Sequence, residues 1–269
     1  MKDPDGIEFL QWALPHLNMR WSGFRKVRKQ VFKRIQRRMN ELSLCSAAGY
    51  RAYLERHADE WMVLDGLCRV SISRFYRDHA LFKTLQEVVL PDLARNFDES
   101  ELSCWCAGCA GGEEPYSLAI MWDRELAAQL PEHRLRVLAT DTDAVQLERG
   151  RRACYPPSAL RELPTEWREG AFTLAAGVYS LRSEHRTQVE FQLHDVRAVP
   201  PPGMFHLILC RNMAFTYFDK SMQSQVLERL LESLAVGGYL VIGTREELRE
   251  GRDDLVRVAQ GRGIYRFGR

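Results

Sequence analysis

Two patterns of apolar residues follow one another along the chain. Up to about residue 90, apolar side chains recur at helical spacing, as at Phe24, Val31 and Ile35, which is typical of helices that bury one face. From about residue 100, short apolar runs alternate with helical patterns, and this alternation is typical of a parallel sheet with right-handed crossovers. We therefore predict an N-terminal helical domain with its linker over 1–88 and an α/β domain over 89–269.

Buried strands are expected at five places in the second domain. Each is a short, mostly apolar run, as the strands of a parallel sheet are. The expected strands cover residues 102–106, 136–140, 205–210, 239–243 and 263–267, with helices at 115–126 and 220–234. This order of elements predicts an open, doubly wound sheet.

Residues 155–200 interrupt the alternation of strands and helices. Apolar runs at 172–174, 178–182 and 188–193 are separated by turn-forming residues, which is typical of antiparallel strands. We expect a small antiparallel insertion over about 160–190, and we expect the run 188–193 to return to the main sheet.

A glycine-rich turn lies between the first expected strand and the helix after it. Gly108, Gly111 and Gly112 follow the strand, and Pro115 suits the first helical position. A strand, a tight glycine turn and a helix N-terminus form a common cradle for nucleotide cofactors, because glycine lets the backbone approach the ligand and the helix end presents unpaired N–H groups. An ordinary turn of an α/β core is the alternative, since a glycine fingerprint alone is a weak signal.

The charge of this turn narrows the class of ligand. Glu113 and Glu114 stand where a pyrophosphate would otherwise lie. Two acids would repel a pyrophosphate and would attract a ligand that carries an amino group and a sulfonium. The sign of the charge therefore favours S-adenosylmethionine.

Further polar residues follow the other expected strands. Asp141 ends the second strand, where folds of this kind place an acid that holds both ribose hydroxyls. The alternative role of Asp141 is to cap the helix expected at 144–150, for which Asp143 is the better candidate. Arg211 and Asn212 follow the strand 205–210 at the same edge, where ligands bind.

A basic helix is expected at 24–38. Its apolar stripe, which includes Val27, lies opposite a basic face made of Lys26, Lys29, Lys33 and Arg37 and flanked by Arg25, Arg28 and Arg34. No acid occurs between Arg20 and Met39, so these charges repel one another rather than pair. A solvated helix surface is the alternative, but the unpaired charge favours a docking surface for an acidic partner. No aromatic interleaving supports nucleic acid as that partner.

Composition sets broader limits. The 269 residues carry a net charge of +2, which implies no bulk attraction to nucleic acid or to an anionic membrane. The seven cysteines are scattered and lie mostly in apolar runs, as reduced cytosolic thiols do, and Cys104, Cys106 and Cys109 lack the further ligands of a metal site. The N-terminus lacks the apolar core of a signal peptide, and no apolar run approaches the roughly 20 residues that span a bilayer. We expect a cytoplasmic monomer without membrane insertion or bound metal.

Several motifs lie along the chain, at 73–78, 105–117, 139–143, 210–212 with 217–219, and 237–240, and the most specific is Gly-Glu-Glu-Pro-Tyr-Ser at 112–117. Together they resemble the chemoreceptor glutamate methyltransferases of CheR type. The resemblance covers nearly the whole chain. It implies an N-terminal helical domain, a linker, and a Rossmann-like methyltransferase domain that binds S-adenosylmethionine and carries a small inserted antiparallel β-subdomain.

The resemblance also implies roles for individual residues. Glu114 would meet the amino group of the cofactor and Asp141 its ribose, while Asp195 and Val196 would border the adenine. The cofactor pocket would also include Ser71 and Ser73, which replace the usual Asn and Thr, together with Gly108, Arg77, Arg211 and Asn212. The product formed from the cofactor would be S-adenosylhomocysteine.

Arg77 and Tyr217 match the catalytic residues of the family. A glutamate acceptor is already ionised at neutral pH, so methyl transfer needs orientation rather than a general base, and the fork of an arginine suits a carboxylate. The alternative role of Arg77 is a salt bridge, for example with Asp78. The acceptor implied is the acidic helical region of a chemoreceptor or similar signalling protein, bound by the basic helix.

Two departures from the family pattern flank the expected substrate pocket. One extra residue in the run through Phe215 and Thr216 shifts Tyr217, and the usual Gly-His-Ser-Glu is Gly243-Thr-Arg-Glu246 here. They motivate a second hypothesis, in which the acceptor is another protein or a small carboxylic acid. A third hypothesis is a non-catalytic module that senses the cofactor.

Overall fold

The computed structural model describes residues 3–71, 73–248, 251–258 and 263–268, and these form two compact units. One unit combines Met1–Ser71 with Thr216–Gln225, and the other combines Ile72–Phe215 with Val226–Arg269. This division differs from the expected boundary at residue 88. The reason is that buried side chains of 75–94 share one hydrophobic core with the strands of the α/β unit.

The first unit is helical. Its helices are α1 (Asp3–His16), α2 (Trp21–Phe24), α3 (Arg28–Glu41), α4 (Ala47–Leu54) and α5 (Glu60–Cys68). The helix expected at 24–38 is therefore broken, because α2 ends at Phe24 and α3 begins at Arg28. Phe24, Val31 and Ile35 are nevertheless buried, as their helical spacing predicted.

The segment 216–225 belongs to this helical unit through backbone contacts. Phe218 forms an isolated antiparallel bridge with Met19, and the N–H of Arg20 donates to the carbonyl of Tyr217 at 2.8 Å. A side chain on Gly23 would collide with the backbone oxygen of Thr216, so glycine is required for this close approach.

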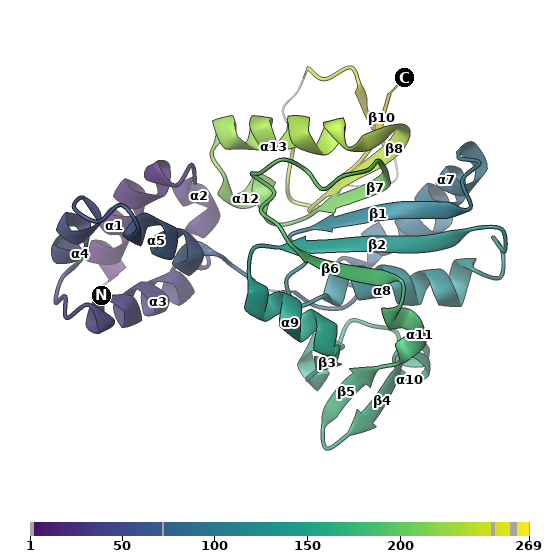
Figure 1. Cartoon of the computed structure of the whole chain (residues 1–269), viewed down its shortest axis with the longest axis horizontal. Helices are drawn as coiled ribbons and strands as arrows, with labels where there is room; N and C mark the ends of the chain where they lie inside the picture. The colour runs from purple at the N-terminus through teal and green to yellow at the C-terminus, as the bar shows by residue number, and fades with distance from the viewer. Residues whose placement is uncertain (1–2, 72, 249–250, 259–262, 269) are drawn as a thin grey trace. The chain divides into compact units, whose positions relative to one another are not determined.

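The second unit contains a seven-stranded sheet with the order β6-β2-β1-β7-β8-β10-β9. Neighbouring strands are parallel from β6 to β8, and β10 is antiparallel to both β8 and β9. The strands are β1 (Glu101–Ala107), β2 (Arg134–Asp141), β6 (Val189–Leu193), β7 (Phe205–Cys210), β8 (Leu234–Ile242), β9 (Leu255–Arg257) and β10 (Ile264–Phe267). The predicted doubly wound α/β sheet is confirmed (Figure 1).

Helices pack with the strands in one hydrophobic core. They are α6 (His79–Thr84), η1 (Leu85–Val89), α7 (Leu90–Asn96), α8 (Glu113–Met121), η2 (Trp122–Leu126) and α9 (Ala144–Arg152), with η1 and η2 in π-helical geometry. Helices α12 (Ala214–Tyr217) and α13 (Lys220–Glu232) are each divided between the two units. All six residues of β7 are buried, as expected of a central parallel strand with both faces covered. Within the described residues, no helix has the length and hydrophobicity needed to cross a bilayer.

An inserted subdomain follows α9. Its sheet has the order β3-β5-β4 and is antiparallel, and β6 then returns to pair with β2. The predicted insertion and the return of 188–193 to the main sheet are thus confirmed, and Figure 1 shows the small sheet apart from the large one. Its elements are β3 (Cys154–Tyr155), η3 (Pro157–Ala159), α10 (Thr165–Ala171), β4 (Phe172–Ala175), β5 (Val178–Leu181) and α11 (Ser183–Arg186).

Candidate functional site

The carboxyl ends of four neighbouring parallel strands meet at one edge of the large sheet. In the order β6, β2, β1 and β7, these strands lead into Asp195, Asp141, Gly108 and Arg211. The pairing register brings the ends level, since Asp141 pairs with Leu193 across β2 and β6. Ligands of open α/β sheets bind outside this edge.

The glycine loop after β1 has a backbone that other residues would strain. Gly108 and Gly112 have φ values of +80° and +87°, in the left-handed region that favours glycine. A Cβ at Gly108 would lie 3.0 Å from Cε of Met213, and one at Gly112 would lie 2.9 Å from Cζ of Phe191. The N–H of Gly108 donates to the carbonyl of Thr140 at 2.8 Å, which fastens the loop to the end of β2.

The two acids at the start of α8 point in different directions. Glu113 is completely buried, and its carboxylate pairs with Arg149 at 2.6 Å. Successive helical residues do not share a face, so Glu114 points elsewhere and pairs with Arg211. The expectation that both acids face a ligand is therefore wrong for Glu113, and the charge argument rests on Glu114 alone.

Arg211 joins the start of α8 to the segment that carries Arg77. Its side chain is only 2% exposed, and it forms ion pairs with Glu114 and, at 2.6 Å, with Asp78. It also donates to the carbonyl oxygen of Arg77 at 3.1 Å. Asp78, the alternative partner considered for Arg77, thus pairs with Arg211.

The backbone around Arg77 is held in an uncommon conformation. Tyr76 and Asp78 have φ values of 55° and 68°, which non-glycine residues rarely adopt. The N–H of Tyr76 donates to Oγ of Ser117 at 2.8 Å, and this hydroxyl donates to the carbonyl of Glu113 at 2.6 Å. These bonds fasten the backbone before the half-buried Arg77 to α8.

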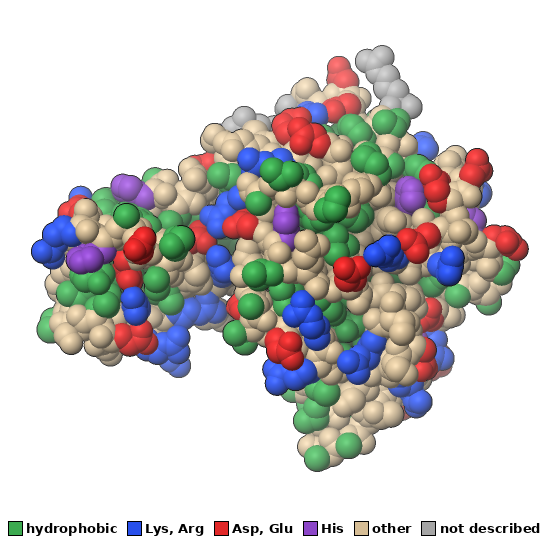
Figure 2. All heavy atoms as spheres, in the orientation of Figure 1, with side chains coloured by type: hydrophobic (Ala, Val, Ile, Leu, Met, Phe, Trp, Pro, Cys, Tyr) green, Lys and Arg blue, Asp and Glu red, His purple; other side chains and the backbone are tan. Residues whose placement is uncertain are grey.

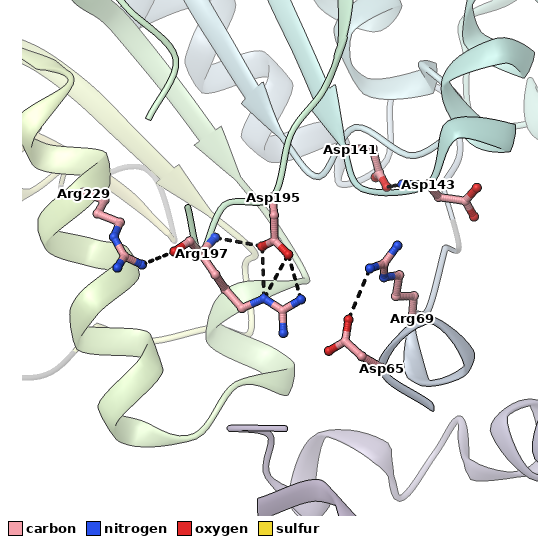
Figure 3. A network of polar contacts seen from close by, with 7 residues as sticks. All are labelled: Asp65, Arg69, Asp141, Asp143, Asp195, Arg197 and Arg229. Carbon is pink, nitrogen blue, oxygen red and sulfur yellow. Dashed lines mark hydrogen bonds and ion pairs between the residues drawn. The ribbon is translucent and has the colours of Figure 1, made fainter. Parts of the chain in front are cut away.

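Asp141 is oriented by two backbone amides. Its Oδ2 accepts from the N–H of Ala110 and its Oδ1 accepts from the N–H of Asp143, each at 2.9 Å, and Figure 3 shows the contact with Asp143. Asp143 caps α9 by accepting from the N–H groups of Val145 and Gln146, as predicted. Asp143 thus takes the capping role, and the place of Asp141 at the strand end fits a ligand that donates hydroxyl groups.

Asp195 has a partner that the sequence did not reveal. The guanidinium of Arg197 forms an ion pair with its carboxylate, with Nη2 2.7 Å from Oδ2. The backbone N–H of Arg197 also donates to Oδ1 at 2.9 Å (Figure 3). Arg229 in turn donates to the carbonyl of Arg197. Val196, the residue between Asp195 and Arg197 in the sequence, is buried. The sequence signal for this ion pair was an acid followed two residues later by an arginine, just after an expected strand.

Glu246 is a second residue whose role sequence reasoning missed. It is 6% exposed, and its Oε2 accepts from the N–H of Asn212 at 2.8 Å and from that of Gly243 at 2.7 Å. It thereby ties the end of β7 to the end of β8. The last position of Gly243-Thr-Arg-Glu246, which keeps the acid of the family motif, was the signal.

Three of the expected site residues do not directly follow a strand of the sheet. Ser71 and Tyr217 belong to the helical unit, where the ring of Tyr217 packs on Phe24 with centroids 5.0 Å apart. Ser73 begins the described part of the α/β unit and is partly exposed. The roles of Ser71, Ser73 and Tyr217 stay predictions.

The basic face, which lies on α3 and the turn before it, is only partly as expected. Lys26, Lys29, Lys33 and Arg37 are exposed, and Figure 2 shows basic side chains along this part of the helical unit. A hollow beside α3 is lined by Gln30, Lys33, Arg34, Gln36, Arg37 and Asn40.

The expectation that the charges of this helix lack partners is wrong for Arg28, Arg34 and Arg37. Arg28 pairs with Asp3 at 3.0 Å, and Arg37 lies 3.8 Å from Glu41. Arg34 donates to the carbonyls of Leu67 and Arg69 at the end of α5. Both pairing acids lie outside residues 20–39: Glu41 is the last residue of α3 itself, whereas the fold brings Asp3 to the helix.

Known proteins share these features. A family model described as the CheR methyltransferase, SAM binding domain, matches residues 71–264. A chemotaxis protein methyltransferase of Listeria innocua is 32% identical over 187 residues, which cover 70% of this chain and 69% of that protein. The chemotaxis protein methyltransferase of Escherichia coli K12 is 30% identical over 227 residues, covering 81% of this chain and 76% of its own.

A longer relative occurs in Rhodobacter capsulatus. This uncharacterized 104.1 kDa protein is 32% identical over 228 residues, which cover 84% of this chain but only 24% of the relative. The chain thus spans about a quarter of that protein.

The observed residues fit S-adenosylmethionine, the cofactor of the matched domain. A backbone cradle at Gly108, an acid at the start of α8 and an oriented acid at the end of β2 offer the contacts that its uncharged and cationic groups require. The chain therefore belongs to the CheR methyltransferase family and is a methyltransferase that uses S-adenosylmethionine.

Proposed function

We propose that this protein esterifies glutamate side chains in an acidic helical region of a chemoreceptor or a similar signalling protein. The observation that carries the proposal is the attachment of the Arg77 backbone, through Arg211, to Glu114 at the start of α8. Arg211 binds the carbonyl of Arg77, the carboxylate of Asp78 and the carboxylate of Glu114. The backbone of Arg77, whose side chain suits a carboxylate substrate, is thereby held beside the expected cofactor.

Separate residues would bind the cofactor and orient the acceptor. S-adenosylmethionine, when bound, supplies an activated methyl group. Glu114 and Asp141 would hold its amino group and ribose, while Asp195, Val196 and Asn212 would bound the rest of the pocket. The acceptor carboxylate is ionised at neutral pH and needs no general base. Arg77 would orient it in line with the methyl group through a bidentate contact.

The acceptor would be attracted by the exposed lysines of the helical unit. Lys26, Lys29 and Lys33 give this face a positive charge, and such a charge raises the encounter rate with an acidic helix.

All seven cysteines are free thiols, which supports action in the reducing cytoplasm.

A methyl-transfer assay tests the proposal. The protein is incubated with S-adenosylmethionine labelled on its methyl group and with membrane vesicles that carry chemoreceptors from a strain lacking its own methyltransferase. Base-labile label on the receptor bands is expected for wild type, because glutamyl methyl esters hydrolyse in base. Label on another protein or on a small carboxylic acid would identify that molecule as the acceptor in place of the receptor. Label that resists base would show that the product is not a methyl ester.

A further inference from the structure

The segment that carries Arg77 is packed against the inserted subdomain. The N–H of Phe75 donates to the carbonyl of Ala159 at 3.0 Å. Its ring is completely buried and meets the rings of Tyr155 and Phe172 edge to face, with centroids 4.8 and 5.3 Å apart. The insertion therefore fixes both the backbone and the side chain of Phe75, which lies two residues before Arg77.

The residues on either side of Phe75 also contact the insertion. Arg74 pairs with Glu162 at 2.8 Å, and the ring of Tyr76 meets that of Trp167 with centroids 4.9 Å apart. Three successive residues thus contact the insertion. The N–H of Tyr76 also donates to Ser117 of α8, and the next two residues, Arg77 and Asp78, are bound by Arg211.

The same insertion reaches the glycine loop. The hydroxyl of Tyr155, on β3, donates to the carbonyl of Gly111 at 2.8 Å. Tyr155 is completely buried, and the guanidinium carbon of Arg149 lies 5.4 Å from the centre of its ring. A single ring therefore contacts both Phe75 and the loop that cradles the cofactor.

We propose that the inserted subdomain is the support of the active site, in which Phe75 positions Arg77 and Tyr155 positions the glycine loop. The proposal for Phe75 rests on the proposed role of Arg77. Both are positioning residues, because the groups that meet substrate and cofactor lie beyond them. Catalytic rates are sensitive to such support, since a displacement of about 1 Å can cost on the order of 100-fold.

Phe75→Leu tests the first half in the full-length chain. It keeps an apolar side chain but removes the edge-to-face contacts. With the receptor-bearing vesicles as acceptor, we expect kcat to fall at least about tenfold, while the Kd for S-adenosylhomocysteine stays within about twofold. A kcat within twofold of wild type would overturn the role of Phe75.

Tyr179→Leu is the matched control. The ring of Tyr179 meets Phe172 with centroids 6.2 Å apart and belongs to the same subdomain, so its loss loosens the same core. It should leave kcat within about twofold, even where it lowers the melting temperature as much as Phe75→Leu does. An equal loss of kcat in both variants would mean that Phe75 only stabilises the fold.

The double variant Phe75→Leu with Arg77→Lys separates this inference from the proposed function. If Phe75 acts through Arg77, the double variant is no slower than Arg77→Lys alone. Additive losses would show that Phe75 acts by another route. If wild type labels no receptor, the proposed acceptor fails, and amide hydrogen exchange decides instead: the Tyr76 amide should exchange faster in Phe75→Leu than in Tyr179→Leu.

Tyr155→Phe tests the second half without any acceptor. Loss of the bond to Gly111 should weaken binding of S-adenosylhomocysteine about 3- to 10-fold, the usual range for one hydrogen bond. Tyr116→Phe is the control, because its buried hydroxyl donates to the carbonyl of Gly150 at 3.0 Å, in α9. Equal affinities in the two variants would overturn the role of Tyr155.

Discussion

Arg211 and Asp78 form an ion pair of 2.6 Å although 133 residues separate them in the sequence. The pair joins the end of β7 to the segment before α6, and Glu114 binds the same guanidinium from the start of α8. Three parts of the expected active site therefore depend on one buried side chain.

Arg211→Met should destabilise the α/β unit. Removing one partner of a buried ion pair leaves the others without compensation, which costs about 3–5 kcal/mol when they are fully buried. The cost here should be at the lower end, because Asp78 keeps 29% of its side chain exposed. Urea unfolding measures the change.

Arg266→Met is the control for this loss. Arg266 is 43% exposed and lies 3.8 Å from Asp92, so its pair should contribute about 1 kcal/mol or less. Equal losses of unfolding free energy in the two variants would contradict the bridging role of Arg211.

Asp141→Ala should weaken binding of S-adenosylhomocysteine by about 1–3 kcal/mol, because ribose hydroxyls lose a charged acceptor. This corresponds to a factor of roughly 5 to 150 in Kd. Asp143→Ala removes the neighbouring carboxylate, whose role is the helix cap, and should cost stability of about 1 kcal/mol with little change in affinity. Calorimetry on both variants decides; unchanged affinity in a folded Asp141→Ala protein would remove Asp141 from the cofactor site.

Arg77→Lys should damage turnover far more than cofactor affinity. Lysine keeps the charge but loses the planar fork that fixes a carboxylate in line. We expect kcat with receptor-bearing vesicles to fall at least about tenfold. Arg161→Lys, at an exposed arginine of the same unit, should have no effect. Normal turnover by Arg77→Lys would leave Arg77 with a structural role only.

The acid stability of the helical unit should depend on Glu60. Two hydrogen bonds from Arg38, at 2.8 and 2.9 Å, and one from the hydroxyl of Tyr50, at 2.8 Å, hold the pKa of the 4% exposed Glu60 below its usual 4.5. A lowered pKa in the folded state means that the stabilisation is fully present above pH 4.5 and is lost as the pH falls through the lower folded value.

Glu60→Gln should therefore be less stable than wild type at pH 7, and the difference should shrink below about pH 4.5. Melting temperatures between pH 7 and pH 3 measure it. Glu41→Gln, which also removes a carboxylate beside Arg38 but at a 52% exposed position, should show little difference at any pH. A deficit for Glu60→Gln that is the same at both ends of this range would argue against the charge of Glu60 as its cause.

Charge reversal on the basic face should separate a receptor acceptor from a small one. Lys29, Lys33 and Arg37 are exposed, and their replacement by Glu should change stability little, since exposed charges contribute about 1 kcal/mol or less each. Methylation of receptor-bearing vesicles should collapse, while the Kd for S-adenosylhomocysteine stays constant. The wild-type rate should also fall with added salt, because screening limits the attraction to about 8 Å near physiological ionic strength.

The control for this experiment is an equal reversal elsewhere. Arg134, Arg152 and Arg182 are exposed in the α/β unit, and their replacement by Glu gives the same change in net charge. It should leave most of the receptor methylation intact. A basic-face variant that methylates its acceptor at the wild-type rate would remove this face from the proposed mechanism.

The sequence by itself determined the architecture of the α/β unit and the class of cofactor. Alternating apolar runs predicted the parallel strands and the antiparallel insertion, because burial on one or both faces imposes a local period on the chain. The turn at Gly108 and the helix cap at Asp143 could also be predicted from the sequence, because a left-handed turn and a helix cap depend on a few adjacent residues.

Only the tertiary structure decided how the charged residues pair. Glu113 and Glu114 are neighbours in sequence, yet one pairs with Arg149 and the other with Arg211. Ion pairs depend on distance in space, and the partners of both acids lie far away along the chain. The contacts of Phe75 and Tyr155 that join the insertion to the active site have the same origin, because packing between distant segments leaves no periodic signal in the sequence.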